Sequence, residues 1–249
     1  MINLHKFLAT SDHPFARMGR NVRRWMRNLS LPAPRIVVKP MLWCFLAIRN
    51  TYYFVMRVFI CEPLFKAYCT KYGNNLHTGV FIHWVMGKGN IIIGDNVTID
   101  GKCSFIFSSR YCDMPKLEIG HRTGVGANCS FVVGKHIHIG EDCMIAGGTS
   151  FFDSNGHPAD PDARKAKRPP SAEEVRPIEI GDNVWIGNNS TIFPGVRIGE
   201  GSIVSARSVV RTQVRPYTVV AGNPARKICD LSRPVVRNEA CCEAESRDV

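Results

Sequence analysis

One histidine in this sequence stands in a setting that suits acid–base chemistry. His157 lies between Gly156 and Pro158, in a long stretch rich in proline and charged residues. The unperturbed pKa of imidazole lies near neutrality, so the ring can take up and release a proton at physiological pH. Glycine allows a close backbone approach and proline fixes φ, which favours a defined position for the ring. His157 is therefore suited to a reaction that needs proton transfer.

A carboxylate near this histidine fits the same chemistry. Asp153 lies four residues before His157. Its side chain could accept a hydrogen bond from the second imidazole nitrogen and stabilise the charged ring, as the carboxylate of a catalytic triad does. Asp153 also fits a turn or cap residue, so both roles stay open.

The fold that must position these residues is indicated by a strict six-residue repeat of β-branched aliphatic residues. A period of six matches neither the alternation of an amphipathic strand nor the 3.6-residue turn of a helix. It is typical of a parallel β-helix, in which each hexad is a short strand plus a turn with one side chain pointing inward. Earlier stretches keep the same period, with a slip of two residues after Phe131. The longest run consists of Ile180, Ile186, Ile192, Ile198, Val204 and Val210.

Turn-forming residues follow this repeat. Glycine comes directly after many of the inward positions, as at Gly181 and Gly187, and an Asp-Asn pair such as Asp182-Asn183 stands where a corner should fall. Glycine and asparagine tolerate the positive φ that sharp corners require. Because stacked coils bury the inward residue and a single coil does not, we expect a mainly β chain with a continuous aliphatic column.

Charge and composition divide the 249 residues into three parts. Residues 1–76 carry twelve Lys and Arg against two acids, which places ten of the eleven net positive charges there. We expect this part to be a basic, mostly helical extension, residues 77–228 to be the β-helix with a loop at 152–177, and residues 229–249 to be a polar tail. Loops longer than about 12–15 residues are usually functional or disordered, so this loop is itself a candidate site.

The extension combines a basic run with an apolar stretch. Arg49 and Arg57 interrupt the apolar stretch from Met41 to Phe65, and each arginine near a bilayer centre costs about 2.5–3.5 kcal/mol on the insertion scale. We therefore expect peripheral contact with an anionic membrane through residues 17–65 rather than a membrane span. A solvated basic helix and a helix packed on a partner subunit are alternatives, and nucleic acid is not expected because no binding motif accompanies the charge. The basic run comprises Arg17, Arg20, Arg23, Arg24 and Arg27.

The ten cysteines form neither a CxxC pair nor a regular framework. Cys103, Cys129 and Cys143 fall among the hexads, where we expect them to act as small apolar residues, and Cys241-Cys242 is expected to be a pair of exposed thiols. This usage favours a reducing cytoplasm over a disulfide scaffold. The opening residues show no signal-peptide cleavage pattern, so we expect a cytoplasmic protein, peripheral at the inner face of the cell membrane.

The closing coils resemble the hexapeptide-repeat O-acetyltransferases, in particular the sugar and polysaccharide acetyltransferases of the maltose, galactoside and O-antigen type. The resemblance rests on the motifs VWIG, PGVRIG and AGNPA, which occur in this order within residues 184–225, and it covers about Ile91 to Ile228. It implies a left-handed β-helix with three hexads per coil. It also implies a homotrimer that binds acetyl-CoA in a cleft between neighbouring subunits.

The resemblance implies roles for individual residues. His157 matches the catalytic base of the family, and Trp185 is either a wall of the cleft or a subunit contact. Asn128 matches a residue that contacts a sugar hydroxyl, but Gly134-Lys135 stands where several sugar-acetylating relatives have an acidic residue. Arg207 stands where the family has glycine, which puts the contact between Ala206 and the pantetheine arm in doubt. Arg211 and Thr212 match a Thr-Lys pair of the family, with the basic residue shifted by one position. Five residues match positions that contact acetyl-CoA in the family, namely Asn188, Ala206, Arg211, Thr212 and Arg226.

The function implied by the resemblance is acetyl-CoA-dependent O-acetylation of a sugar or glycan hydroxyl by direct transfer, without a metal. Such a reaction needs a base near the hydroxyl and donors for the tetrahedral oxyanion. The basic extension favours a larger acceptor, such as a lipid-linked or polymeric glycan in surface polysaccharide biosynthesis. N-acetylation of an amino-sugar nucleotide is the main alternative.

Two alternatives belong to other classes of protein. The same fold hosts zinc enzymes similar to γ-class carbonic anhydrases, which need three converging histidines. Only His121, His136 and His138 fall within the coils as candidate ligands, and outward-facing polar residues on a solvated face explain them more simply. The other alternative is a non-catalytic β-helix that serves as an assembly subunit.

Overall fold

The computed structural model describes residue 7 and residues 9–232, and it divides the chain into two compact units, Met1–Thr51 and Tyr52–Val249. The polar tail was predicted to start at residue 229, but the last described strand runs to Asp230; residues 233–249, with the Cys241-Cys242 pair, lie outside the described residues.

The first unit is helical over most of its described residues. Helix α2 (Pro14–Asn28) begins with proline at a position where no backbone N–H is needed, and the side chain of His13 accepts a hydrogen bond from the N–H of Phe15. Helix α3 (Arg35–Val55) has no buried residue. It continues through a π-helical segment, η1 (Met56–Cys61), into α4 (Glu62–Tyr68). By length and composition alone, the continuous helix Arg35–Tyr68 is long and apolar enough to cross a membrane.

The second unit begins with the end of this helix, which packs on the first coils. Phe65 of α4 is buried, and its ring centroid lies 5.3 Å from that of Phe105. Glu62 is also buried and lies 3.2 Å from His77 Nδ1 and 3.5 Å from Arg57 Nη1. The first strand starts at Lys71, so strand structure begins inside the predicted extension.

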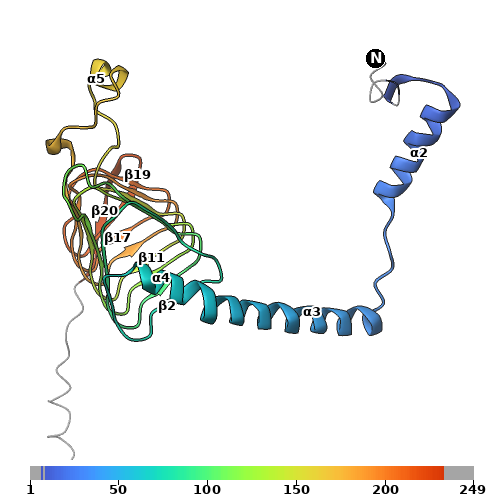
Figure 1. The fold of residues 1–249 in the computed structure, drawn as a ribbon, viewed down its shortest axis with the longest axis horizontal. Helices are drawn as coiled ribbons and strands as arrows, with labels where there is room; N and C mark the ends of the chain where they lie inside the picture. Colours follow the sequence, from blue (N-terminus) through green and yellow to red (C-terminus); the bar gives the residue numbers. More distant parts are fainter. Residues whose placement is uncertain (1–6, 8, 233–249) are drawn as a thin grey trace, which may run out of the picture. The chain divides into compact units, whose positions relative to one another are not determined.

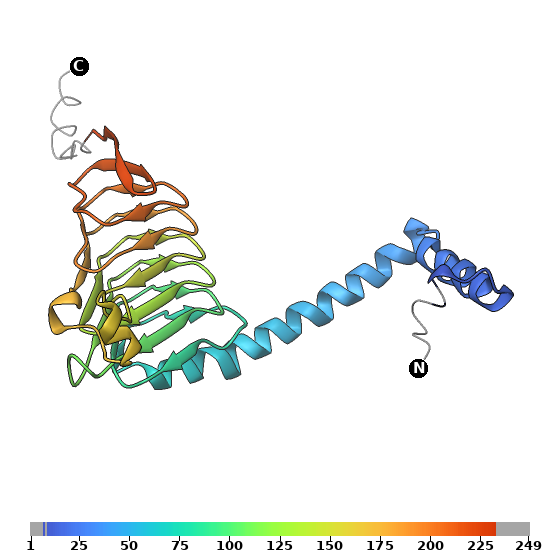
Figure 2. The same ribbon diagram turned by 90° about the horizontal axis from the view of Figure 1, so that it is seen from above.

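Three parallel sheets, here called A, B and C, stack strand upon strand along the unit (Figures 1 and 2). Only the last pair, β19 and β20, is antiparallel among the described strands. Sheet A contains β1 (Lys71–Tyr72), β4 (Asn90–Ile93), β7 (Lys116–Ile119), β10 (His136–Ile139), β13 (Ile178–Ile180) and β16 (Arg197–Ile198). Sheet B contains β2 (His77–Thr78), β5 (Thr98–Ile99), β8 (Gly124–Val125), β11 (Met144–Ile145), β14 (Trp185–Ile186), β17 (Ile203–Val204), β19 (Thr218–Gly222) and β20 (Ala225–Asp230). Sheet C contains β3 (Trp84–Met86), β6 (Ser104–Phe107), β9 (Ser130–Val133), β12 (Ser150–Phe152), β15 (Thr191–Ile192) and β18 (Val209–Val210).

The hexad residues form the predicted inward column. Along sheet C, the rings of Phe105, Phe131 and Phe151 stack at centroid distances of 5.2 and 5.1 Å, and the register continues through Ile192 to Val210. All five of these side chains are fully buried. Identical positions in successive coils are directly paired, so one side chain per hexad is enough to build a continuous core. Three cysteines are buried in the same column, as expected of small apolar residues: Cys103, Cys129 and Cys143.

Each coil turns at three corners, named here by the sheets that they join. The B–C corner adopts positive φ in coil after coil, with values of 60° at Asn128, 55° at Asn189 and 58° at Arg207. The C–A corner holds the long loop from Asp153 to Pro177, which protrudes from the stacked coils (Figure 1). Short capped helices order this loop, namely α5 (Pro161–Lys165), capped by Asp160, and η2 (Ala172–Glu174), whose capping box pairs Ser171 with Glu174.

Candidate functional site

His157 lies at the root of the long loop, close to the end of strand β12. Its side chain is exposed, and no hydrogen bond or ion pair holds the imidazole among the described residues. Gly156 has φ of 76°, a conformation that favours glycine, and Pro158 is buried. The ring is therefore at the surface, next to a buried proline, where it is accessible to a ligand.

Asp153 has partners other than the predicted one. Its carboxylate is fully buried and accepts three backbone hydrogen bonds, from Gly134 at 2.6 Å, Lys135 at 2.7 Å and His136 at 3.0 Å. Burial raises the pKa of this carboxyl, although the three N–H donors oppose that shift. The predicted contact with His157 is not among the hydrogen bonds of the described chain. Instead, Asp153 ties the turn between β9 and β10 to the root of the loop, which is a positioning role.

A cavity of about 400 Å³ lies in the C–A corner beside this loop. Asn155, two residues before His157, lines it together with Arg176, Phe193 and Arg211. The guanidinium of Arg211 stacks 4.3 Å above the ring of Phe193. The structure thus brings Arg211, predicted from the sequence, next to the loop of His157. Sequence reasoning missed Asn155 and Arg176, because neither lies in a recognised motif.

Two further predicted residues share a second cavity. Thr212 and Arg226 line a hollow of about 230 Å³ at the last coil, under the β19–β20 hairpin. Arg215 and Lys227 line the same hollow, which gathers three basic side chains around it. Such a group of donors suits a phosphate-bearing ligand. Arg215 was not predicted, since its place in the hollow depends on how the last coil closes.

The remaining predicted residues lie along the B–C corner. Asn128, Asn188 and Ala206 are all exposed there. Backbone hydrogen bonds join this corner from coil to coil, and the one between Arg207 N–H and the Asn188 carbonyl measures 2.8 Å. Arg207 keeps the left-handed conformation that glycine would adopt more easily, so the substitution leaves the corner geometry intact.

The predicted residues therefore fall on two different corners of the coil. His157, Asp153, Arg211 and Thr212 belong to the C–A corner, whereas Asn128, Asn188 and Ala206 belong to the B–C corner. A full strand of sheet C separates these corners within each coil. Trp185 lies on neither corner, but on the outer face of sheet B, where it is half exposed and lines a shallow hollow with Met144.

Two family profiles match the repeats of this chain. One is described as bacterial transferase hexapeptide (six repeats) and matches residues 177–212. The other is described as hexapeptide repeat of succinyl-transferase and matches residues 116–150. Both matches fall within the stacked coils of sheets A, B and C.

Curated relatives match over a similar part of the chain. A chloramphenicol acetyltransferase from Klebsiella aerogenes is 33% identical over 131 residues, which are 53% of this chain and 59% of that protein. The galactoside O-acetyltransferase of Escherichia coli (strain K12) is 31% identical over 140 residues, 56% of this chain and 64% of that protein. The chain thus spans between half and two thirds of the length of these relatives.

Solved structures of AntD, an N-acyltransferase from Bacillus cereus, share the fold. A point mutant in complex with dTDP-4-amino-4,6-dideoxyglucose and coenzyme A is 26% identical with a TM-score of 0.57, over 69% of this chain and 89% of that chain. A complex with dTDP and 3-hydroxybutyryl-CoA is 26% identical with a TM-score of 0.55, over 69% of this chain and 88% of that chain. The repeats, the three stacked parallel sheets and these relatives together show that the chain has the hexapeptide-repeat, left-handed β-helix fold that acetyltransferases of this kind share.

Proposed function

We propose that this protein is an acetyl-CoA-dependent acetyltransferase that modifies a hydroxyl of a sugar or glycan, with His157 as general base. The observation that carries the proposal is the setting of His157 in a chain with this fold. The ring is exposed at the root of the loop in the C–A corner, between Gly156, which has a left-handed backbone, and the buried Pro158. Relatives with acetyltransferase names support the reaction class.

The proposed reaction is a direct transfer. One imidazole nitrogen of His157 accepts the proton of the acceptor hydroxyl while the hydroxyl oxygen attacks the thioester carbonyl of acetyl-CoA. The tetrahedral intermediate collapses with cleavage of the C–S bond, so that the acetyl group stays on the acceptor oxygen. The imidazolium then returns the proton to the coenzyme A thiolate. Asp153 contributes by fixing the root of the loop.

We further propose that the protein acts as a homotrimer, with each site formed between neighbouring subunits. The support is the division of the predicted residues between two corners of one chain. The C–A corner of one subunit would supply His157, and the B–C corner of a neighbour would supply Asn128 for the acceptor and Asn188 and Ala206 for the pantetheine arm. Thr212 and Arg226 would then bind the phosphate-bearing end of acetyl-CoA.

The acceptor we propose is a lipid-linked or polymeric glycan of surface polysaccharide biosynthesis. The galactoside O-acetyltransferase among the relatives supports a sugar hydroxyl. N-acetylation of an amino-sugar nucleotide is a second candidate, because a similar solved structure holds dTDP-4-amino-4,6-dideoxyglucose with coenzyme A.

A thiol-release assay with acetyl-CoA tests this function. The full chain is incubated with galactosides, polymeric glycans and amino-sugar nucleotides, and the acetylated product is then treated with mild base. We expect acceptor-dependent thiol release with a hydroxyl sugar and a base-labile ester product. A base-stable amide formed only from an amino sugar would support the N-acetyl alternative. Absence of acceptor-dependent release across the panel would contradict both.

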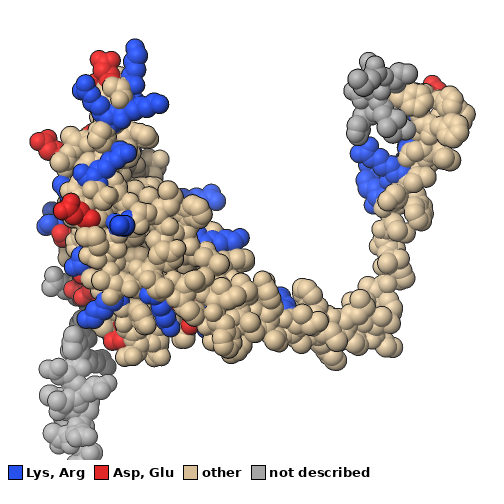
Figure 3. Space-filling model, in the orientation of Figure 1, with Lys and Arg blue, Asp and Glu red and all other residues tan. Residues whose placement is uncertain are grey.

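We also propose that the N-terminal helices attach the protein peripherally to the inner face of the cell membrane. Helix α2 supports this proposal, because its side chains separate by type. At 100° per residue, its apolar residues occupy one side and its arginines the opposite side (Figure 3). The apolar side chains are between 49% and 69% exposed, and α2 contains no acidic residue. They are Phe15, Met18, Val22, Trp25, Met26 and Leu29.

An amphipathic basic helix of this kind lies in the plane of a bilayer surface. Its apolar side enters the boundary between headgroups and acyl chains, while its arginines meet anionic headgroups, each contributing roughly 1 kcal/mol. The exposed aromatic residues of α3 would add apolar contact, among them Trp43, Phe45 and Phe54.

Vesicle co-sedimentation checks this attachment. We expect the full chain to bind vesicles that contain anionic lipid and to be released by added salt, because the charge attraction is screened within roughly 8 Å at physiological ionic strength. Binding should fall when all five arginines of the basic run are changed to Gln, and also when Met18 and Trp25 are changed to Ser. The matched control removes four charges from the loop instead, at Arg164, Lys165, Lys167 and Arg168. Equal binding to neutral vesicles, or no binding to anionic ones, would contradict the proposal.

A further inference from the structure

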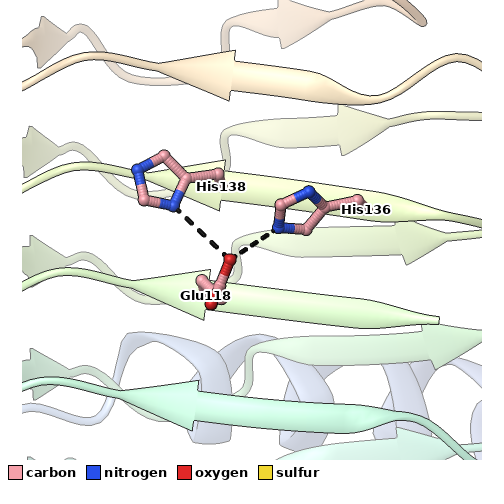
Figure 4. A group of neighbouring side chains, drawn as sticks. All are labelled: Glu118, His136 and His138. Atoms are coloured by element: carbon pink, nitrogen blue, oxygen red, sulfur yellow. Dashed lines mark hydrogen bonds and ion pairs between the residues drawn. The ribbon is translucent and has the colours of Figure 1, made fainter. Parts of the chain in front are cut away.

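Three potential metal ligands converge on the outer face of sheet A, and the proposed acetyl transfer uses none of them. Glu118 of β7 and His136 and His138 of β10 point toward one another (Figure 4). His136 Nε2 lies 2.7 Å from Glu118 Oε2, and His138 Nδ1 lies 3.8 Å from the same oxygen. One ligand atom from each of the three residues lies within 4.8 Å of the other two.

The parallel register explains why these residues meet. His138 is paired directly with Glu118, and His136 is paired with Lys116. Residues two apart in a strand point to the same face, so all four side chains lie on the outer surface of sheet A. Their inward neighbours Ile137 and Ile139 are fully buried, which fixes the strand that carries the two histidines.

Of the two carboxylate oxygens of Glu118, only Oε2 faces the two imidazoles. Lys116 Nζ binds the other carboxylate oxygen, Oε1, at 2.6 Å. The carboxylate on the next strand, Glu179, is already held by Arg197 at 3.0 Å. The ligand set is therefore one carboxylate and two imidazoles.

We infer that Glu118, His136 and His138 bind a single divalent transition-metal ion, with Zn²⁺ as the best-suited ion. Two imidazole nitrogens and one carboxylate oxygen form a ligand set that zinc accepts, with solvent in the fourth position. Zinc-bound donors lie about 2.0–2.2 Å from the metal, which places tetrahedral donors roughly 3.4 Å from one another. The two distances to Glu118 Oε2 lie on either side of this value, so small side-chain rotations suffice.

The ion would link adjacent coils of the β-helix without taking part in the acetyl transfer. Hollows on both sides of the cluster keep it open to solvent, one of about 1070 Å³ lined by His136 and His138 and one of about 440 Å³ lined by Glu118 and His138. His121 does not belong to the group of ligand atoms that lie within 4.8 Å of one another, and its Nδ1 lies 3.1 Å from Asp95. The site thus differs from the three-histidine centre considered from the sequence.

Titration calorimetry with ZnCl₂ on the chelator-treated full chain, in excess Mg²⁺, tests this inference. We expect one ion per chain to bind at this cluster with micromolar or tighter affinity. The affinity should weaken by at least about 10-fold in His136→Asn, in His138→Asn and in Glu118→Gln, since even supporting partners of metal ligands are worth that much.

Two controls separate this site from other zinc ligands of the chain. His121→Asn removes a neighbouring histidine of similar exposure and should leave the affinity unchanged. The described cysteines are free thiols and some are exposed, so Co²⁺ serves as a second probe. The absorption spectrum of the bound Co²⁺ should show nitrogen and oxygen ligands and no thiolate band. Unchanged stoichiometric binding in the His136→Asn, His138→Asn double variant, or only millimolar binding by the native chain, would overturn the inference.

Discussion

Replacing His157 by alanine is expected to lower turnover with acetyl-CoA by about 10²–10⁴-fold, the usual contribution of a general base. The acceptor hydroxyl would then have to lose its proton to water while it attacks the thioester. The melting temperature should hardly change, because the imidazole is exposed and makes no hydrogen bond within the described structure. Thiol release and thermal unfolding of the same preparations measure both quantities.

His121→Ala is the matched control for this variant. His121 also lies at a turn of the β-helix, and its ring contacts Asp95 rather than the loop of His157. It should retain full activity. If His157→Ala keeps near-normal turnover while the native chain is active, the proposed base is wrong. If the protein is a non-catalytic assembly subunit instead, His157→Ala should leave its function unchanged.

Replacing Ile192 by aspartate is expected to abolish soluble expression. Ile192 is fully buried, and the register places it between Phe151 of the coil before and Val210 of the coil after. An unpaired carboxylate in this column costs several kcal/mol even after relaxation. The total stability of a domain is about 5–15 kcal/mol, and the lost isoleucine packing adds about 2–5 kcal/mol for such truncations.

Thr191→Asp is the matched control for Ile192→Asp, because it introduces the same carboxylate at the neighbouring, outward-facing position. Thr191 is adjacent in the same strand but points outward and is half exposed. It should express as soluble, folded protein, as judged by the soluble fraction and by circular dichroism. Soluble, folded Ile192→Asp would show that the hexad residue does not support the column.

The β-helix could be predicted from the sequence because its information is local and repeated. A β-branched residue at every sixth position, with glycine or asparagine at the corners, indicates which side chains point inward. Ile180, Ile186 and Ile192 fall on sheets A, B and C in turn, and each is fully buried. The slip after Phe131 also has a structural reason. Both Phe131 and Val133 point inward from the four-residue strand β9 before the chain turns at Gly134.

The candidate base could also be located from the sequence, but its partner could not. Gly156-His157-Pro158 stands at the start of the long loop, and the ring of His157 is exposed there. Spacing along the chain suggested Asp153 as the partner of the ring. The carboxylate instead satisfies three backbone donors of the preceding coil, which lies 17 to 19 residues away in sequence. Buried donors without partners are costly, so the tertiary contact determined the role.

Only the stacking of coils decided which polar side chains meet. The sequence determined the repeat, the loop and the types of residue that could do chemistry. It did not determine that the predicted site residues divide between the C–A and B–C corners, nor that Glu118 faces His136 and His138. Coil length sets these neighbours, because a parallel ladder pairs residues about 20 positions apart, and each inserted loop shifts that distance. Outward positions carry no hydrophobic constraint, so no local pattern in the sequence records their partners.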